Sequence, residues 1–162
     1  SEERRQLRDS GAVLEQQVAA DLPPVLTDPA ETARALQNLI RNAIKYGGTP
    51  PWVSITAQRG MYTGEVAICV RDNGLGIAAE DLPHIFEPFY RSREVVAAQI
   101  HGSGLGLSLV RHVVEGNGGR IGVDSAPGQG SAFTVLLPGA SSEARQPSAE
   151  GQRAPARPRL WG

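Results

Sequence analysis

The chain has 162 residues, a length typical of a single domain, which disfavours an architecture with two independent cores. Its 16 Lys and Arg residues nearly balance its 17 Asp and Glu residues, and the formal net charge of -1 offers no global positive field to recruit nucleic acid or an anionic membrane surface. No segment approaches the roughly 18 consecutive apolar residues of a membrane span, so we expect a soluble chain without membrane contact.

The N-terminal part predicts the end of a helix, a short strand and one long helix. Residues 2–9 are polar and stop before a Ser-Gly pair, which is typical of the end of a helix that begins upstream. A strand is expected at residues 12–18. Asp28, Pro29 and Glu31 then combine a capping carboxylate, a proline at the first helical position and an acid in the first turn. The long helix therefore begins here, and its apolar periodicity continues to about residue 46, before two glycines.

The middle and C-terminal parts alternate strands with helices. Strands are expected at residues 52–57 and 65–71, as a hairpin, and at residues 120–124 and 131–137. Between these pairs the sequence predicts a glycine-broken loop at 72–76, a short helix near 79–85, an irregular polar stretch at 91–102 typical of a mobile loop, and a helix at 105–115. This order predicts an α+β fold, a two-layer sandwich in which a mixed, mostly antiparallel sheet packs on about three helices.

The domain boundaries follow from the same pattern. Residues 1–11 are interpreted as the end of an upstream linker helix and residues 12–138 as the folded domain. Residues 139–162 are expected to form a disordered tail, because Ala, Ser, Glu, Arg, Gln and Pro dominate there without a period. The lone Cys69 lies in an apolar run and cannot form an internal disulfide, which suits a reducing compartment.

The long helix carries a polar edge formed by Asn38, Asn42, Lys45 and Tyr46, whose spacing of three and four residues puts them on one side. A carboxamide oxygen is a hard neutral ligand suited to Mg²⁺, a lysine ammonium suits a phosphate, and a tyrosine ring can lie against a base. Taken alone, the same residues also fit an ordinary solvated helix face.

Two glycine-rich segments add further candidates. Asp72 opens the sequence Asp-Asn-Gly-Leu-Gly-Ile directly after a strand, where its carboxylate can accept a hydrogen bond from an exocyclic amine, although an ordinary turn fits as well. Residues 102–107, Gly-Ser-Gly-Leu-Gly-Leu, lead straight into a helix. Their alternate glycines expose backbone N–H groups beside the positive helix end, which suits polyphosphate. This segment resembles neither the dinucleotide-binding fingerprint nor the phosphate loop that ends in Gly-Lys-Ser/Thr.

In chain order, these segments resemble the sequence boxes of sensor histidine kinases, a branch of the superfamily that includes gyrase, chaperone and mismatch-repair ATPases. Residues 38–46 look like the N box, 72–77 like the first glycine box, 85–91 (Ile-Phe-Glu-Pro-Phe-Tyr-Arg) like the F box, and 102–107 like the second glycine box. The resemblance covers roughly residues 12–138. It implies the Bergerat-type ATP-binding fold, with ATP and Mg²⁺ as ligands.

The resemblance also implies a role for each matching residue. Asn42 would hold the Mg²⁺ that bridges the phosphates, and Asn38 would lie beside it as the second catalytic residue. Lys45 and Tyr46 would face phosphate and adenine. Asp72 would accept from the adenine amino group, with the last glycine of its box against the ring.

The F box and the second glycine box together resemble the anchor and closing edge of a flexible lid. Phe86 and Phe89 would anchor this lid, at about residues 87–103, and Arg91 or Arg93 could pair with phosphate. The complete set implied to bind the nucleotide is Asn38, Asn42, Lys45, Tyr46, Asp72, Gly74, Gly76, Ile77, Phe89, Arg91, Gly102, Ser103, Gly104, Leu105, Gly106 and Leu107.

Related ATPases of the superfamily share the N box and first glycine box, but one position separates them from this chain. In those enzymes a glutamate one helical turn before the metal-binding asparagine acts as general base for water, whereas Asn38 stands at this position and cannot accept the proton. The remaining residues still suffice to present a γ-phosphate to an external nucleophile, because phosphoryl transfer depends mainly on positioning and electrostatics. This favours a protein-histidine kinase.

The phosphoacceptor histidine is expected outside this chain. In the family it is followed by an acidic residue, whereas His84, His101 and His112 are followed by Ile, Gly and Val. The implied partners are a histidine-bearing dimerisation domain and a response regulator, with a monomer expected for this chain. Family habit puts the domain in the cytoplasm and attaches the full-length protein to the membrane. The alternative is an anti-sigma-type serine kinase or a nucleotide-binding adaptor, which the F box resembles less well.

Overall fold

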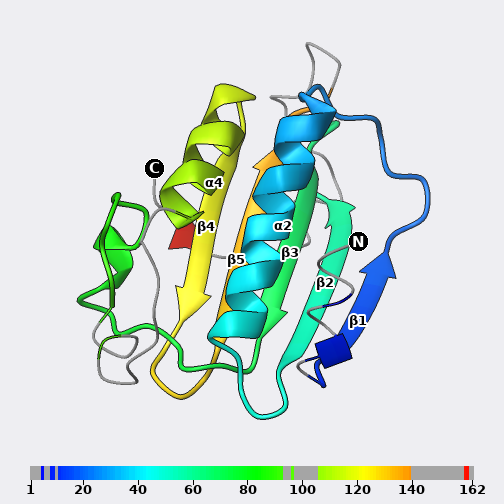
Figure 1. The fold of residues 1–162 in the computed structure, drawn as a ribbon. Helices are drawn as coiled ribbons and strands as arrows, with labels where there is room; N and C mark the ends of the chain where they lie inside the picture. Colours follow the sequence, from blue (N-terminus) through cyan, green and yellow to red (C-terminus); the bar gives the residue numbers. More distant parts are fainter. Residues whose placement is uncertain are drawn as a thin grey trace.

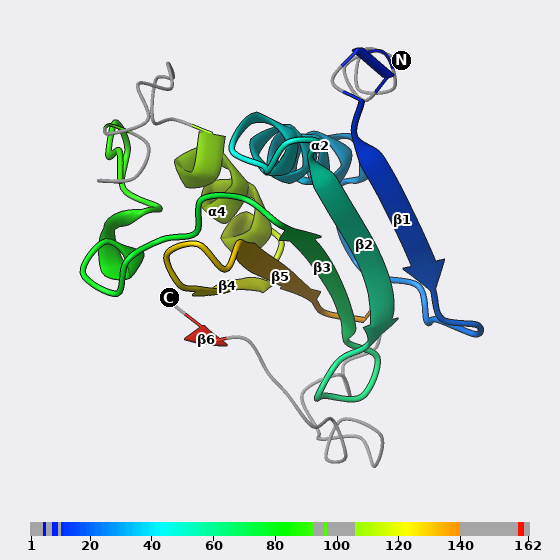
Figure 2. The same cartoon turned by 90° about the horizontal axis from the view of Figure 1, so that it is seen from below.

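The computed structural model describes residues 11–92 and 106–139, together with residues 5, 8, 9, 96, 159 and 160. They form two layers, a six-stranded sheet and two α-helices that lie side by side on one face of it (Figure 1). Figure 2 shows both helices on the same side of the sheet. The predicted α+β two-layer sandwich is confirmed. In the described part, no helix is long and apolar enough to cross a membrane.

The elements follow the predicted order. They are β1 (Val13–Val18), α2 (Pro29–Lys45), β2 (Trp52–Arg59), β3 (Val66–Asp72), the 3₁₀ turn η1 (Leu82–His84), α4 (Gly106–Gly116), β4 (Arg120–Ser125), β5 (Ser131–Leu137) and β6 (Arg159–Leu160). The strand order across the sheet is β1-β2-β3-β5-β4-β6. β1 runs parallel to β2 and every other neighbouring pair is antiparallel, so the sheet is mixed and mostly antiparallel as predicted.

The start of α2 is fixed by the residues that predicted it. Oδ1 of Asp28 accepts hydrogen bonds from the backbone N–H groups of Ala30 (3.0 Å) and Glu31 (3.1 Å), which satisfies donors that have no partner within the helix. The backbone N–H of Asp28 donates to Oδ1 of Asn117, directly after α4, at 2.9 Å. The beginning of α2 and the end of α4 are therefore linked, which fixes the two helices relative to each other.

The hydrophobic core lies between the helices and the sheet. Its buried members include Ala35, Leu39 and Ala43 of α2, Val110 and Val114 of α4, and Val53, Val70, Ile121, Val123, Phe133, Val135 and Leu137 of the strands. Helical periodicity then puts the residues that precede Leu39 and Ala43 at the border of this core. The polar edge of α2 is therefore held in place by the apolar face beside it.

Three sequence-based predictions differ from the structure. The helix predicted near 79–85 is only the 3₁₀ turn η1, because Pro83 lies inside the predicted range, lacks the N–H that an α-helix needs there, and disfavours helical backbone in the residue before it. In the stretch predicted to be irregular, the described residue Val96 is helical, and its N–H donates to the carbonyl of Ser92 at 3.1 Å. Residues 159–160, within the tail predicted to be disordered, pair with β4 as β6. The rest of that tail lies outside the described residues.

Candidate functional site

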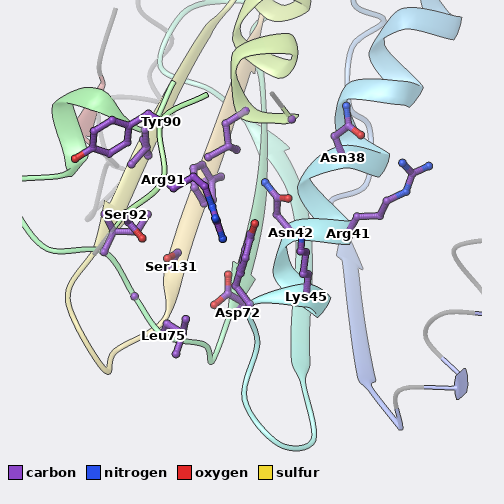
Figure 3. Close-up of a pocket in the computed structure, with 17 residues that line it drawn as sticks. Asn38, Arg41, Asn42, Lys45, Asp72, Leu75, Tyr90, Arg91, Ser92 and Ser131 are labelled. Carbon is purple, nitrogen blue, oxygen red and sulfur yellow. The ribbon is translucent and has the colours of Figure 1, made fainter. Parts of the chain in front are cut away.

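A cavity of about 280 Å³ opens between α2, the start of α4 and the segment after η1 (Figure 3). The predicted site residues that line it are Asn38, Asn42, Lys45, Tyr46, Asp72, Gly76, Ile77, Arg91, Gly106 and Leu107. Of the other predicted residues, Gly74 and Phe89 do not line the cavity. Gly102, Ser103, Gly104, Leu105 and Arg93 lie outside the described residues. The two elements that the sequence places far apart, the N box and the helix after the second glycine box, thus meet at one cavity.

Asp72 is the buried carboxylate of this cavity. It ends β3, where it pairs with Val53 of β2, and it is only 9% exposed. Its Oδ1 accepts a hydrogen bond from the backbone N–H of Gly74 at 2.8 Å. Burial raises the pKa of the Asp72 carboxyl from 3.8 to about 6, against the opposing effect of hydrogen bonds from the backbone of Gly74 and Ser131. The site therefore contains an acceptor whose desolvation is only partly offset by the protein.

The turn that follows Asp72 is tied to its surroundings by backbone hydrogen bonds. Oδ1 of Asn73 accepts from the N–H groups of Gly48 (3.2 Å) and Trp52 (2.9 Å), across the loop between α2 and β2. The N–H of Leu75 donates to the carbonyl of Tyr46 at 3.1 Å, at the end of α2. These bonds hold the turn against α2, which fixes the distance between Asp72 and the polar helix edge.

The two glycines of this turn are required by packing within the protein. A Cβ on Gly74 would lie 2.0 Å from the carbonyl oxygen of Tyr46. Gly76 has φ +72°, and a Cβ there would lie 1.9 Å from the carbonyl oxygen of Ala126, in the turn between β4 and β5. The close approach that these glycines permit is therefore of one backbone segment to another, and Gly76 lines the cavity in addition.

The polar edge of α2 forms one wall of the cavity. Asn38, Asn42 and Lys45 project from successive turns of the helix (Figure 3). Nζ of Lys45 lies 5.2 Å from the centroid of the Tyr46 ring, over its face. Arg41 also lines the cavity, although Figure 3 shows its guanidinium pointing away from the other labelled side chains. This wall therefore offers carboxamides and cationic groups together.

The opposite wall is formed by α4 and the F-box segment. Phe86 is 4% exposed, and its ring meets that of Phe133 edge to face at 6.3 Å between centroids. Cζ of Arg111 on α4 lies 5.8 Å from the centroid of the Phe86 ring. Phe86 thus anchors this segment in the core. Phe89 does not, since it is 71% exposed and its backbone has φ +67°, which turns it away from the core.

Several lining residues were not predicted from the sequence, namely Arg41, Leu75, Ile85, Tyr90, Ser92, Ser131 and Phe133. Tyr90 and Ile85 lie inside the F-box segment, so the segment itself was the available signal. Ser131 and Phe133 carry no such signal. They reach the cavity because β5 pairs with β3 in a register that sets Ala132 opposite Arg71, next to Asp72.

The side chains of the cavity suit a metal ion that takes most of its coordinating oxygens from a bound phosphate compound and from water. In the described part of the chain, no group of three or more His, Cys, Asp or Glu side chains could hold a metal ion. The carboxamide of Asn42 lies beside the helix start, since a Cβ on Gly106 would lie 3.8 Å from its Oδ1 and 3.9 Å from its Nδ2. One neutral oxygen ligand suits a Mg²⁺ ion that takes its other ligands from phosphates and water.

A two-layer α+β fold, with a buried carboxylate facing a polar helix edge and a glycine-led helix start, defines an ATP-binding domain of the Bergerat type. Residues 27–141 match the family described as histidine kinase-, DNA gyrase B-, and HSP90-like ATPase, and the chain belongs to this family. Within it, the chain is similar to the ATP-binding catalytic part of sensor histidine kinases, as the following relatives show.

Two curated relatives illustrate the similarity. The chain is 42% identical over 125 residues to the sensor-like histidine kinase SenX3 of Mycobacterium tuberculosis (strain ATCC 25618 / H37Rv). This match covers 75% of this chain and 30% of that protein. It is 41% identical over 111 residues to the signal transduction histidine-protein kinase AfsQ2 of Streptomyces coelicolor. That match covers 68% of this chain and 20% of that protein. The chain thus spans less than a third of the length of these relatives.

Solved structures share the fold. The mycobacterial sensor histidine kinase MprB superposes with a TM-score of 0.72 at 30% identity, over 90% of this chain and 91% of that one. Full-length ShkA in complex with AMPPNP superposes with a TM-score of 0.70 at 30% identity, over 86% of this chain and 28% of that one. The catalytic and ATP-binding domain of histidine kinases is therefore the class to which this chain belongs.

Proposed function

We propose that this domain binds Mg-ATP and transfers its γ-phosphate to a histidine on a separate dimerisation domain, from which a response regulator then receives it. The observation that supports this most is the convergence of three surfaces on one cavity: the polar edge of α2, Asp72 at the end of β3, and the start of α4. Each surface suits a different part of ATP, so one bound nucleotide can engage all three.

The base end of the cavity would recognise adenine. The carboxylate of Asp72 can accept a hydrogen bond from the exocyclic amine. Because the carboxylate is buried and has few water partners, this hydrogen bond would stabilise the bound base. Leu75 and Ile77 supply apolar contact to a flat ring, and Tyr46 adds an aromatic surface.

The phosphate end would be formed by cations and by the start of α4. Lys45 and Arg91 line the cavity from opposite walls and can pair with phosphate oxygens. α4 begins at Gly106, and the N-terminal end of a helix carries a partial positive charge that attracts phosphate oxygens. Mg²⁺, held by Asn42, would neutralise the phosphate charge that develops during transfer.

The absence of a carboxylate at residue 38 supports transfer to an external nucleophile. Asn38 lines the cavity one helical turn before Asn42, and its carboxamide cannot take a proton from water. ATP would therefore be held with its γ-phosphate intact until a histidine reaches it. We assign this reaction to the cytoplasm, where ATP is available, and to two-component signalling.

Transfer can be tested by mixing the chain with γ-labelled ATP and a histidine-bearing dimerisation domain, or with a serine-bearing partner of the anti-sigma type. We expect label on the histidine protein, released by acid treatment, and little label on the chain incubated alone. Acid-stable label on the serine partner would instead support the serine-kinase alternative. Stoichiometric label on the isolated chain would contradict the assignment of the acceptor to another domain.

A further inference from the structure

We infer that Tyr90 is a positioning residue: its hydrogen bond to the buried carboxylate of Asp81 fixes the place where the F-box segment enters the cavity, and thereby aims Arg91 at the phosphates. The inference rests on the proposed function, because it assigns Arg91 to phosphate. It adds a pair of residues, Asp81 and Tyr90, to which the sequence pattern gave no role.

The carboxylate of Asp81 is directed to Tyr90. Asp81 is only 2% exposed, and the Tyr90 hydroxyl donates a hydrogen bond to its Oδ1. Asp81 also stands at the N-cap of η1, where an aspartate side chain usually accepts from the first helical N–H groups. It makes no such capping bond here. A buried carboxylate that does not cap its own helix and accepts from a phenol is suited to fixing that phenol.

The backbone just before Tyr90 is in a strained conformation, which the Tyr90 hydrogen bond helps to maintain. Phe89 has φ +67°, a left-handed conformation that is strained for a non-glycine residue, and its ring is mostly exposed. The N–H of Tyr90 donates to the carbonyl of Glu87 at 3.2 Å, so the turn is tightly closed. The ring of His84 lies 5.3 Å from that of Tyr90, and its Nδ1 lies 2.9 Å from Oε1 of Glu87. These contacts hold the turn in its strained form.

The hydrogen bond of Tyr90 also affects the positions of the next two residues, Arg91 and Ser92. Tyr90, Arg91 and Ser92 all line the cavity, and Figure 3 shows them on the wall opposite Asn42 and Lys45. Ser92 is buried and its carbonyl accepts from the N–H of Val96, so the chain is fixed on the far side as well. Arg91 therefore stands between two fixed points, and loss of the Tyr90 bond would release one of them.

The test is a double-mutant cycle on the full chain, with Mg²⁺ and a non-hydrolysable ATP analogue titrated calorimetrically. Tyr90→Phe keeps the ring and removes the hydroxyl, and Arg91→Ala removes the cation. Each substitution should weaken binding of the analogue about tenfold, the effect of one charge-assisted hydrogen bond. Adenosine, which lacks phosphates, should bind each variant as it binds the wild type. In the Arg91→Ala background, Tyr90→Phe should add no further loss.

Independent, additive losses in the cycle, or an equal loss for adenosine, would show a merely structural role and overturn the inference. Unchanged affinity of Tyr90→Phe would do the same. Should Tyr90→Phe fail to fold, the Tyr90→Phe/Asp81→Asn variant removes the buried charge along with its phenol partner and carries the same expectation. The wild-type titration separates the two claims, since failure of the wild type to bind the analogue contradicts the proposed function and not the role of Tyr90.

Discussion

The carboxamide of Asn42 in α2 lies next to Gly106, the first residue of α4: a Cβ on Gly106 would be in van der Waals contact with it, 3.8 Å from Oδ1 and 3.9 Å from Nδ2. The hydrogen bond from the Asp28 N–H to Asn117 holds the two helices together at their other ends. The carboxamide is thereby kept at the positive end of α4, where phosphate oxygens and a metal ion would meet.

This relationship predicts that Asn42 acts through the metal. Asn42→Ala should weaken binding of a non-hydrolysable ATP analogue in the presence of Mg²⁺ by about tenfold or more, because an oxygen ligand is lost. Without Mg²⁺, the affinity should change little, and ADP should still be recognised through its base. Calorimetry with and without Mg²⁺ measures both values. Equal losses in the two conditions would argue against a metal role for this side chain.

Asp72 should control the selectivity for adenine. Asp72→Asn keeps the size of the side chain and an oxygen that can accept from Gly74, but it can turn an amide donor toward the adenine amine. The mismatch across a buried gap should cost roughly 1–3 kcal/mol of binding free energy or more, with loss of the preference for adenine over guanine nucleotides. Competition between ATP and GTP measures this, and an unchanged affinity for ATP would exclude the assignment.

The raised pKa of Asp72 predicts a pH-dependent stability. The folded-state pKa of about 6 exceeds the ordinary value of 3.8, so the folded chain binds more protons between these values, and stability should fall as the pH rises through this range. The cost should be complete above pH 6 and amount to at most about 3 kcal/mol. Urea denaturation of the wild type and of Asp72→Asn isolates this effect, because other carboxyls titrate alike in both. A difference between the two proteins that does not change from pH 4 to 7 would contradict the assignment.

Gly76 offers a test of the turn that carries Asp72. Gly76→Ala adds a Cβ that would lie 1.9 Å from the carbonyl of Ala126, whereas Gly128→Ala, at φ +74°, meets nothing within 4 Å. Both variants incur the strain of a left-handed alanine, about 1 kcal/mol, but only Gly76→Ala must also displace backbone. Gly76→Ala should therefore lose clearly more stability and also lose nucleotide affinity. Similar losses in both variants would mean that the turn can move freely.

The sequence predicted those parts of the site that depend on local chemistry. The Asp28 cap, the periodicity of α2 and the strand before Asp72 can each be recognised from a few neighbouring residues. Most of the box residues that the structure describes line one cavity, although Gly74 and Phe89 do not. Ser131 and Phe133 were missed because only the pairing of β5 with β3 brings them there. β6 was missed for the same kind of reason, since its short strand exists through pairing with β4 and not through its own composition.

The F-box segment shows a different limit of sequence patterns. The resemblance of residues 85–91 to the F box implied that Phe86 and Phe89 would both act as anchors. Only Phe86 packs in the core, because Phe89 has a left-handed backbone in the turn after η1 and its side chain is exposed. The left-handed conformation of Phe89, which no residue type in the segment predicts, therefore turns its side chain away from the core.

The most direct test of the central claim is calorimetric titration of the wild-type chain with a non-hydrolysable ATP analogue, with and without Mg²⁺. If the α2 edge, Asp72 and the start of α4 enclose a purine triphosphate, the analogue should bind one to one and more tightly with the metal. No detectable binding at millimolar analogue in either condition would contradict the account.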